Sequence, residues 1–96
     1  MMVVVAYDID TSTAEGEKRL RKVAKICEAY GVRVQNSVFE VIVDPAQMTS
    51  MKSSLSRIID PGYDSVRFYR MGSNWKPRID SIGKQLRIEQ DDVMIL

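Results

Sequence analysis

Two aspartates close the apolar run at the start of the chain, and their type and spacing suit metal chemistry. Asp8 and Asp10 are two positions apart, so in an extended strand both carboxylates point to the same side. A hard cation such as Mg²⁺ takes oxygen ligands, keeps several waters and is often held by one or two protein carboxylates. The same spacing suits an ordinary strand end, with Asp10 helping to start the next helix. From the residues alone, the strand-end interpretation is the more favoured.

The residue types that are missing narrow the possible chemistry. The chain has no histidine, which excludes Ser-His-Asp and Cys-His nucleophilic schemes and metal sites built on imidazole. Its single cysteine, Cys27, cannot form an internal disulfide and lies in a helical pattern. We therefore predict a buried thiol, a cytoplasmic, reducing compartment, and chemistry that rests on carboxylates with a hard metal.

A cluster of basic residues occupies the segment after the first apolar run. Basic and acidic residues nearly cancel over the whole chain, 14 against 13, so a nucleic-acid surface must be a local patch. Most such clusters are a solvated helix face. The alternative is contact with phosphate groups, to which Arg33 would add. The five clustered residues are Lys18, Arg19, Arg21, Lys22 and Lys25.

Hydrophobic spacing predicts the first elements that position these residues. Residues 2–9 are β-branched and apolar almost throughout, which is typical of a strand with both faces covered. A helix over residues 13–30 is predicted by the capping-box spacing of Ser12 and Glu15 and by apolar residues at helical intervals. Gly31 ends this pattern.

The middle of the chain repeats this arrangement. Residues 32–43 alternate in two halves around a polar break at Asn36, which predicts a pair of strands with a turn or bulge there. Asp44 and Pro45 have the types preferred at the N-cap and first position of a helix, so a second helix follows. Residues 65–71 alternate again and predict another strand.

This order predicts one α+β domain of the ferredoxin-like βαββαβ type, with two helices on one face of an antiparallel sheet. Residues 1–78 form the expected core, and residues 79–96 form a C-terminal segment whose short apolar pieces need a partner surface such as another subunit. We expect no membrane span, and the apolar start is too short for a signal peptide. Because this fold hosts unrelated functions, the function must be argued from the site.

Several stretches resemble the small CRISPR-associated endonuclease family of the spacer-acquisition machinery. The segment from Gly31 to Glu40 is the most specific of them, and D-P-A-Q together with the Asn74 and Trp75 pair is similar to the subtype I-C branch. The matching stretches are Y-D-I at Tyr7 to Ile9, R-L-R-K-V-A-K-I-C-E from Arg19 to Glu28, Y-G-V-R-V-Q-N-S-V-F-E from Tyr30 to Glu40, D-P-A-Q from Asp44 to Gln47, and S-V-R-F-Y-R-M-G-S-N-W-K from Ser65 to Lys76.

The resemblance implies a homodimer whose two sheets pack together, with the C-terminal segment extending the partner's sheet. It implies one Mg²⁺ or Mn²⁺ shared between the two Asp8 carboxylates, and metal-dependent cleavage of single-stranded RNA or double-stranded DNA. It also implies a central place, beside a separate integrase, in the complex that holds the new spacer duplex. Asp8 thus becomes the expected catalytic and metal residue, whereas Asp10 stays a turn residue.

The resemblance further implies roles for residues around Asp8. Arg19, Arg21 and Arg33 are expected to bind nucleic acid, and Tyr7 and Phe39 to support the site. The sequence departs from the family at Asp80 and Ser81, which stand where the family tends to have a Glu-His pair, and this affects the dimer strand rather than the fold.

Two other functions stay open. In the first, the protein is a non-catalytic structural subunit that binds the duplex through its basic faces and scaffolds the integrase. In the second, it is a ligand-sensing regulatory module that binds a small molecule at a sheet interface. Salt-sensitive affinity for DNA separates the first from the second.

Overall fold

The structure is a computed structural model that describes residues 1–72 and 78–83. It confirms the predicted order of strand, helix, strand, strand, helix and strand, and it adds a fifth strand to the sheet. The elements in chain order are β1 (Met2–Asp8), α1 (Ala14–Tyr30), β2 (Gly31–Gln35), β3 (Val38–Ile42), α2 (Pro45–Ile58), β4 (Ser65–Met71) and β5 (Arg78–Gly83).

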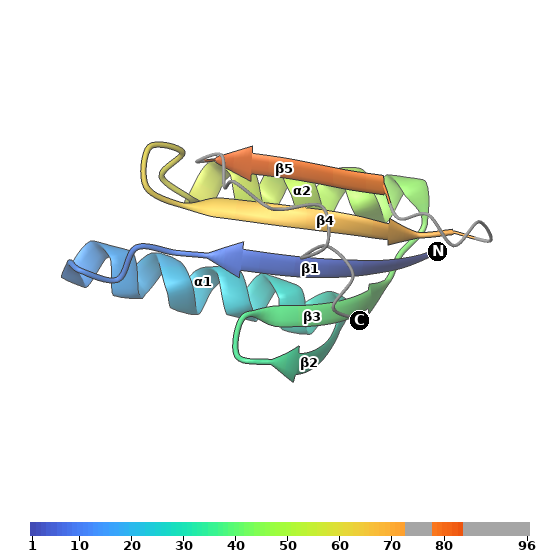
Figure 1. Cartoon of the computed structure of the whole chain (residues 1–96), viewed down its shortest axis with the longest axis horizontal. Coiled ribbons are helices and arrows are strands. Elements are labelled where there is room, and N and C mark those ends of the chain that lie inside the picture. The colour runs from blue at the N-terminus through green and yellow to red at the C-terminus, as the bar shows by residue number, and fades with distance from the viewer. Residues whose placement is uncertain (73–77, 84–96) are drawn as a thin grey trace.

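The five strands form one antiparallel sheet in the order β2-β3-β1-β4-β5. β1 therefore lies at the centre, between β3 and β4, which explains why its sequence is apolar almost throughout (Figure 1). Side chains from both helices and from the three central strands share a single core, so α1 and α2 cover one face of the sheet. Within residues 1–72 and 78–83, no helix covers the other face, which we call the open face, and Val4 and Arg67 on it are nevertheless buried.

Alternation along β1 decides which side chains enter the core. Val3, Val5 and Tyr7 are buried against the helices, whereas Met2 and Asp8 are exposed. Burial alternates in β3 as well, where Phe39 and Val41 are fully buried, whereas in β4 the first four residues are all buried, Val66 and Phe68 fully. The expected core residues of the two helices, among them Val23, Cys27, Met51 and Leu55, are also fully buried.

The helix starts follow the predicted chemistry with one correction. Asp44 accepts a hydrogen bond from the Gln47 amide at 2.7 Å, and the Gln47 side chain accepts one from the Asp44 amide at 2.9 Å, so α2 begins with a full capping box. The N-cap of α1 is Thr13, whose hydroxyl accepts from the Gly16 amide at 3.1 Å. The prediction of Ser12 as this cap was wrong by one residue, because Thr13 and Ser12 have the same capping chemistry.

β5 gives the segment at residues 79–82 the partner surface that its sequence required. It pairs with β4 of the same chain, with Tyr69 opposite Ile79 and Val66 opposite Ile82. Residues 78–83 thus complete this chain's own sheet, whereas an extension of a partner's sheet stays a prediction. The expectations for the Asn74 and Trp75 pair and for residues 84–96 lie outside the described residues.

The hairpin between β2 and β3 also matches its prediction. The turn lies at Asn36 and Ser37, and the register of β2 against β3 shifts between Arg33 and Gln35. Neither α1 nor α2 is long and apolar enough to cross a membrane, which holds for all helices in the described ranges.

Candidate functional site

Asp8 is the last residue of β1 and its side chain is exposed. It lies opposite Ser65 of β4, and its chain neighbours Tyr7 and Ile9 are buried in the core. Alternation along the strand therefore places the Asp8 carboxylate on the open face of the sheet, away from the helices. The role of Asp8 as a metal ligand stays a prediction.

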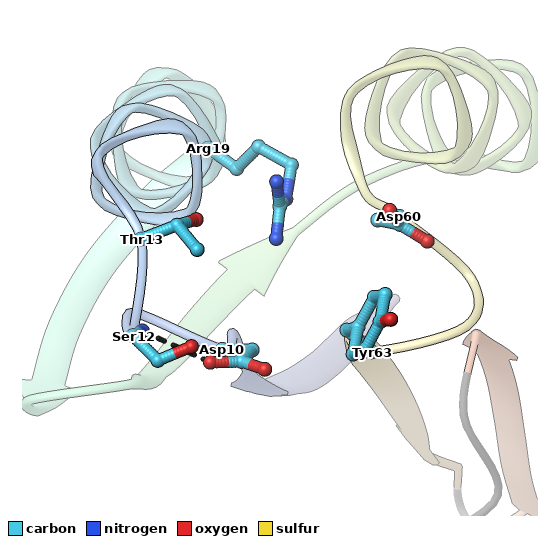
Figure 2. Close-up of a pocket in the computed structure, with 6 residues that line it drawn as sticks. All are labelled: Asp10, Ser12, Thr13, Arg19, Asp60 and Tyr63. Carbon is cyan, nitrogen blue, oxygen red and sulfur yellow. Dashed lines mark hydrogen bonds between the residues drawn. The ribbon is translucent and has the colours of Figure 1, made fainter.

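The second aspartate has a different environment. The Asp10 carboxylate accepts a hydrogen bond from the Ser12 amide at 2.9 Å, drawn as a dashed line in Figure 2. This side-chain bond two residues along the chain is the usual arrangement of an aspartate in a turn that leads into a helix. Its contact with the segment before α1 supports the interpretation of Asp10 as a turn residue.

The donor set around Asp8 suits a hard cation only as part of a larger site. Within residues 1–72 and 78–83, no three acidic, histidine or cysteine side chains are grouped closely enough to hold a metal ion. An exposed carboxylate is a suitable ligand for Mg²⁺ or Mn²⁺, which proteins often hold through one or two carboxylates and several waters. Asp8 therefore fits such an ion, provided that a second chain or a bound phosphate completes the coordination.

Asp64 is the most heavily bonded carboxylate near this strand end. It precedes β4, and its side chain is 0% exposed. One oxygen accepts from the Asp10 amide at 2.9 Å, and the other accepts from the Asp60 amide at 2.8 Å. Arg19 donates to both oxygens, through Nε at 2.7 Å and Nη2 at 3.4 Å. Asp64 thus joins α1, the end of β1 and the turn after α2.

The protonation of this pair follows from its contacts. Burial alone raises the pKa of the Asp64 carboxyl, but the hydrogen bonds from Arg19 and from the amides of Asp60 and Asp10 outweigh it, so the pKa is lowered. The hydrogen bond to Asp64 raises the pKa of Arg19. Both partners are therefore charged at neutral pH, and the ion pair is intact.

An open pocket of about 300 Å³ lies beside this ion pair. Arg19 projects from α1 toward it, while Asp60 and Tyr63 border it from the segment after α2 (Figure 2). The remaining lining residues, Asp10, Ser12 and Thr13, come from the loop between β1 and α1. The pocket thus lies between the two loops whose amides, those of Asp10 and Asp60, donate to Asp64.

Three other predicted residues meet on the helix-covered side of the sheet. The rings of Tyr7 and Phe39 are stacked with centroids 6.1 Å apart, and the Arg33 guanidinium lies 5.2 Å from the Phe39 centroid. Arg33 also donates to Glu28 of α1 at 3.3 Å, and both of these side chains are about half exposed. This group packs the β2–β3 hairpin against α1, so Tyr7 and Phe39 have a structural role.

Burial is the main cause of the raised pKa values of Tyr7 and Cys27. Burial raises the pKa of Tyr7, whose hydroxyl donates to the Asn36 carbonyl at 3.3 Å. Burial also raises the pKa of the Cys27 thiol to about 12, so the thiol is neutral and unreactive at physiological pH. This confirms the prediction that Cys27 is a small buried apolar group.

The basic cluster of α1 divides into two parts. Four of its members are exposed at spacings of three and four residues and together line a shallow groove of about 440 Å³. We call this set the basic stripe: Lys18, Arg21, Lys22 and Lys25. Arg19 lies outside the stripe, because its side chain turns to Asp64 and is only 19% exposed. Among the described residues, no hydrogen bond or ion pair joins Asp8 to Arg19, Arg21 or Arg33.

Sequence reasoning did not single out Asp64. Its position after a Pro-Gly turn is typical of a solvated loop aspartate, and its partner Arg19 is 45 positions away. The only sequence signal is the apolar strand that follows directly, which places Asp64 at the edge of the core.

Comparisons with known proteins agree with the fold. The family model described as CRISPR associated protein Cas2 matches residues 1–79. A curated relative from Halalkalibacterium halodurans, named CRISPR-associated endonuclease Cas2, is 52% identical over 95 residues and covers 99% of each chain. A relative from Rhodospirillum rubrum, named CRISPR-associated endoribonuclease Cas2 3, is 48% identical over 95 residues and covers 99% of this chain and 100% of its own.

Solved structures show the same likeness in three dimensions. The crystal structure of Cas2 from Streptococcus pyogenes matches with a TM-score of 0.72 and 57% identity, over 78% of this chain and 90% of that one. A hypothetical protein from Thermus thermophilus matches with a TM-score of 0.66 and 33% identity, over 75% of this chain and 82% of that one. Sequence and structure together show that this chain belongs to the CRISPR-associated Cas2 family.

Proposed function

We propose that the protein is a metal-dependent endonuclease that cleaves phosphodiester bonds in single-stranded RNA, double-stranded DNA or both. The observation that carries the proposal is the exposed Asp8 carboxylate at the end of the central strand, on the open face of the sheet. The names of the relatives from H. halodurans and R. rubrum, an endonuclease and an endoribonuclease, support the reaction class.

A homodimer formed through the open face would bring two Asp8 carboxylates together. This face carries large exposed apolar side chains: Met2 is 38%, Val32 is 68% and Ile42 is 72% exposed. In the sheet register, Met2 lies opposite Ile42, and Val32 and Val4 both lie opposite Glu40, so all of them share the side of Asp8. Exposed apolar side chains gathered on one face are typical of a protein interface.

The two Asp8 side chains of such a dimer would hold Mg²⁺ or Mn²⁺. When bound, the ion lowers the pKa of its water and neutralises charge on the phosphate that is cleaved. Arg21, in the basic stripe, and Arg33 would hold the nucleic-acid backbone through charge contacts with phosphates. Tyr7 and Phe39 would act indirectly, by packing the strand that ends at Asp8.

A cleavage assay with metal removal tests this proposal. Purified protein is incubated with labelled single-stranded RNA and with double-stranded DNA, in Mg²⁺, in Mn²⁺ and after chelation with EDTA. We expect cleavage of at least one substrate with either ion, its loss in EDTA, and its return when the ion is restored in excess. Cleavage that continues unchanged in EDTA would contradict a metal-dependent mechanism, and no cleavage under any condition would leave the scaffold function described next.

The basic stripe favours a second function, a non-catalytic subunit that grips the spacer duplex and scaffolds the integrase. Its four cations line one groove on the outer surface of α1. We propose that the protein works in the cytoplasm as the central dimer of the spacer-integration complex, in either function. The neutral buried thiol of Cys27 suits that reducing compartment. The D-P-A-Q segment at Asp44 to Gln47 supports membership of the subtype I-C branch, which an adjacent set of subtype I-C genes would test.

Charge reversal in the basic stripe should weaken duplex binding. We expect the double variant Arg21→Glu, Lys22→Glu to bind at least about tenfold more weakly at low salt and to reduce the slope of log Kd against log salt by about 1 to 2, because each lost phosphate contact removes about one released counterion. Fluorescence anisotropy with a labelled duplex over a range of salt concentrations measures both quantities.

The control variant places two carboxylates at exposed serines on α2, outside the stripe. Ser50→Glu, Ser56→Glu tests whether added negative charge alone weakens binding. It should keep the salt slope of the wild type. Equal losses in both double variants would show a general charge effect and would remove the basic stripe as the binding surface.

A further inference from the structure

We infer that the Arg19–Asp64 ion pair positions the strand end that carries Asp8, so that Arg19 acts on cleavage through Asp64 and does not act by holding nucleic acid. Both are positioning residues and neither touches the reacting atoms. The inference rests on the proposed nuclease function and deepens it, because it assigns a role to two residues outside the Asp8 site.

Asp8 is only two residues before Asp10, whose amide is bonded to Asp64. Asp8 is the last paired residue of β1, opposite Ser65, and Asp64 is the chain neighbour of Ser65. The Asp10 amide donates to Asp64 at 2.9 Å, and Ile9 between them is buried in the core. The backbone around Asp8 is therefore held on its N-terminal side by the β-ladder and on its C-terminal side by Asp64.

The Asp64 carboxylate is held in turn by Arg19 and by the Asp60 amide. This carboxylate is fully buried and receives the Asp60 amide at 2.8 Å together with two bonds from Arg19. A buried carboxylate that loses its cation either takes up a proton or moves to water. Either response weakens the bond to the Asp10 amide, so removal of Arg19 disturbs the Asp8 strand end without direct contact.

At Gly16, α1 packs tightly against the backbone of Asp10 and Thr11. Gly16 lies in the first turn of α1, and a Cβ atom there would collide with the Asp10 carbonyl oxygen. The amide of Asp10 is thus held by Asp64 while its carbonyl lies against α1. A shift of α1 is therefore transmitted to the residues that follow Asp8, since at Gly16 there is no room even for a Cβ atom between the helix and the Asp10 backbone.

Arg19 differs from the residues of the basic stripe in its contacts. Arg19 uses Nε and Nη2 for Asp64, its charge is balanced by that carboxylate, and its side chain is 19% exposed. Arg21, two residues later, is exposed and lines the groove of the stripe. Within the described part of the chain, Arg21 has no ion-pair partner. Replacement of Arg19 and replacement of Arg21 should therefore have opposite effects in a nucleic-acid binding assay, with binding kept in the first case and weakened in the second.

A double-mutant cycle tests the inference. Arg19→Gln, Asp64→Asn and the double variant are compared with wild type at saturating substrate, at a temperature where near-ultraviolet circular dichroism shows each variant folded. We expect each single variant to lower kcat about 10- to 100-fold, as the loss of an outer-shell partner does at metal sites, and to raise the metal concentration for half-maximal rate. The double variant should be no worse than the poorer single variant, because both changes break one interaction.

The matched control is Arg21→Gln, which removes one arginine from the same helix. It should weaken substrate binding and reduce the salt slope, whereas Arg19→Gln should leave substrate Kd and its salt slope at wild-type values. The conservative Arg19→Lys, which keeps a cation for Asp64, should recover part of the lost kcat and provides a milder variant if Arg19→Gln does not fold. Losses that multiply in the double variant, or a reduced salt slope in Arg19→Gln, would overturn the inference.

Amide hydrogen exchange of Asp10 gives a readout that needs no cleavage. Its exchange should accelerate at least about tenfold in Arg19→Gln and in Asp64→Asn but not in Arg21→Gln, because the Asp64 carboxylate protects that amide. If the wild type cleaves nothing, the proposed nuclease function fails, while this exchange measurement still decides whether the pair holds the strand end. Unchanged Asp10 exchange in both variants would overturn the positioning role.

Discussion

Replacing Asp8 with asparagine should reduce metal-dependent cleavage by at least about 100-fold without changing the fold. Asparagine keeps the size of the side chain but loses the charge that a divalent cation requires. Outer-shell changes at metal sites already cost about 10- to 100-fold, so loss of a ligand should cost at least the upper end of that range. Because Asp8 is exposed and ends its strand, no core contact is lost. Single-turnover cleavage in Mg²⁺ and in Mn²⁺ measures the effect.

The neighbouring aspartate provides the matched control for this experiment. Asp10→Asn makes the same chemical change two residues away, and the asparagine side-chain oxygen can still accept from the Ser12 amide. We expect cleavage within a few-fold of wild type. Full cleavage by Asp8→Asn would rule out Asp8 as the metal ligand. If Asp8→Asn lost cleavage but kept spacer acquisition in cells, the scaffold function would be the biological one.

Replacing Asp64 with alanine should lower the free energy of unfolding by about 3 to 5 kcal/mol at pH 7. The change removes a fully buried carboxylate that accepts from Arg19 and from the amides of Asp10 and Asp60. Those two amides then have no acceptor in place of the carboxylate, and the cost of burying them unbonded falls on the folded state. Urea denaturation followed by circular dichroism measures the difference.

The pH dependence of this contribution has a definite sign. The folded-state pKa of Asp64 is lowered, so its charge stabilises the fold at pH values above the unfolded pKa of about 3.9 and stops doing so as pH falls through the folded pKa. The stability difference between wild type and Asp64→Asn should therefore be constant above about pH 5 and should shrink below about pH 4. Thermal melts of both proteins between pH 3 and pH 7 measure how this stability difference changes with pH.

Asp44→Asn is the control for both stability measurements. Asp44 is exposed at the N-cap of α2, and asparagine is an equally good cap, so this change should cost only a few tenths of a kcal/mol. A difference between wild type and Asp64→Asn that stayed constant down to pH 3 would contradict a lowered pKa for Asp64. A loss for Asp64→Ala no larger than that for Asp44→Asn would contradict its place in the buried network.

Local pattern was enough to predict every element of this protein except β5, which the sequence marked only as a short apolar piece in need of a partner surface. Alternation and β-branched content marked β1 and β4, and helical spacing marked the two helices, because burial on one face imposes these periods directly on the chain. The start of α2 at Asp44 was also predicted, since capping is a contact between residues three positions apart. The start of α1 was predicted one residue early because Ser12 and Thr13 offer the same hydroxyl chemistry.

The site was only partly predictable, for a physical reason. The absence of histidine left carboxylates as the available chemistry, and the family resemblance then made Asp8 the expected metal ligand. Strand alternation places its side chain on the open face. Arg19 and Arg21 look alike in the sequence, with the same charge on the same helix, yet one is bound to Asp64 and the other is exposed. Their difference depends on where Asp64 lies, and that residue is 45 positions away from Arg19.

Contacts across such separations carry no local signature, because they arise only when the sheet brings the end of β1 next to the start of β4. Composition and spacing therefore determined the two helices and the strands other than β5, and they limited the available chemistry to carboxylates. Only the folded chain decided which arginine balances a buried charge and which one remains available for nucleic acid.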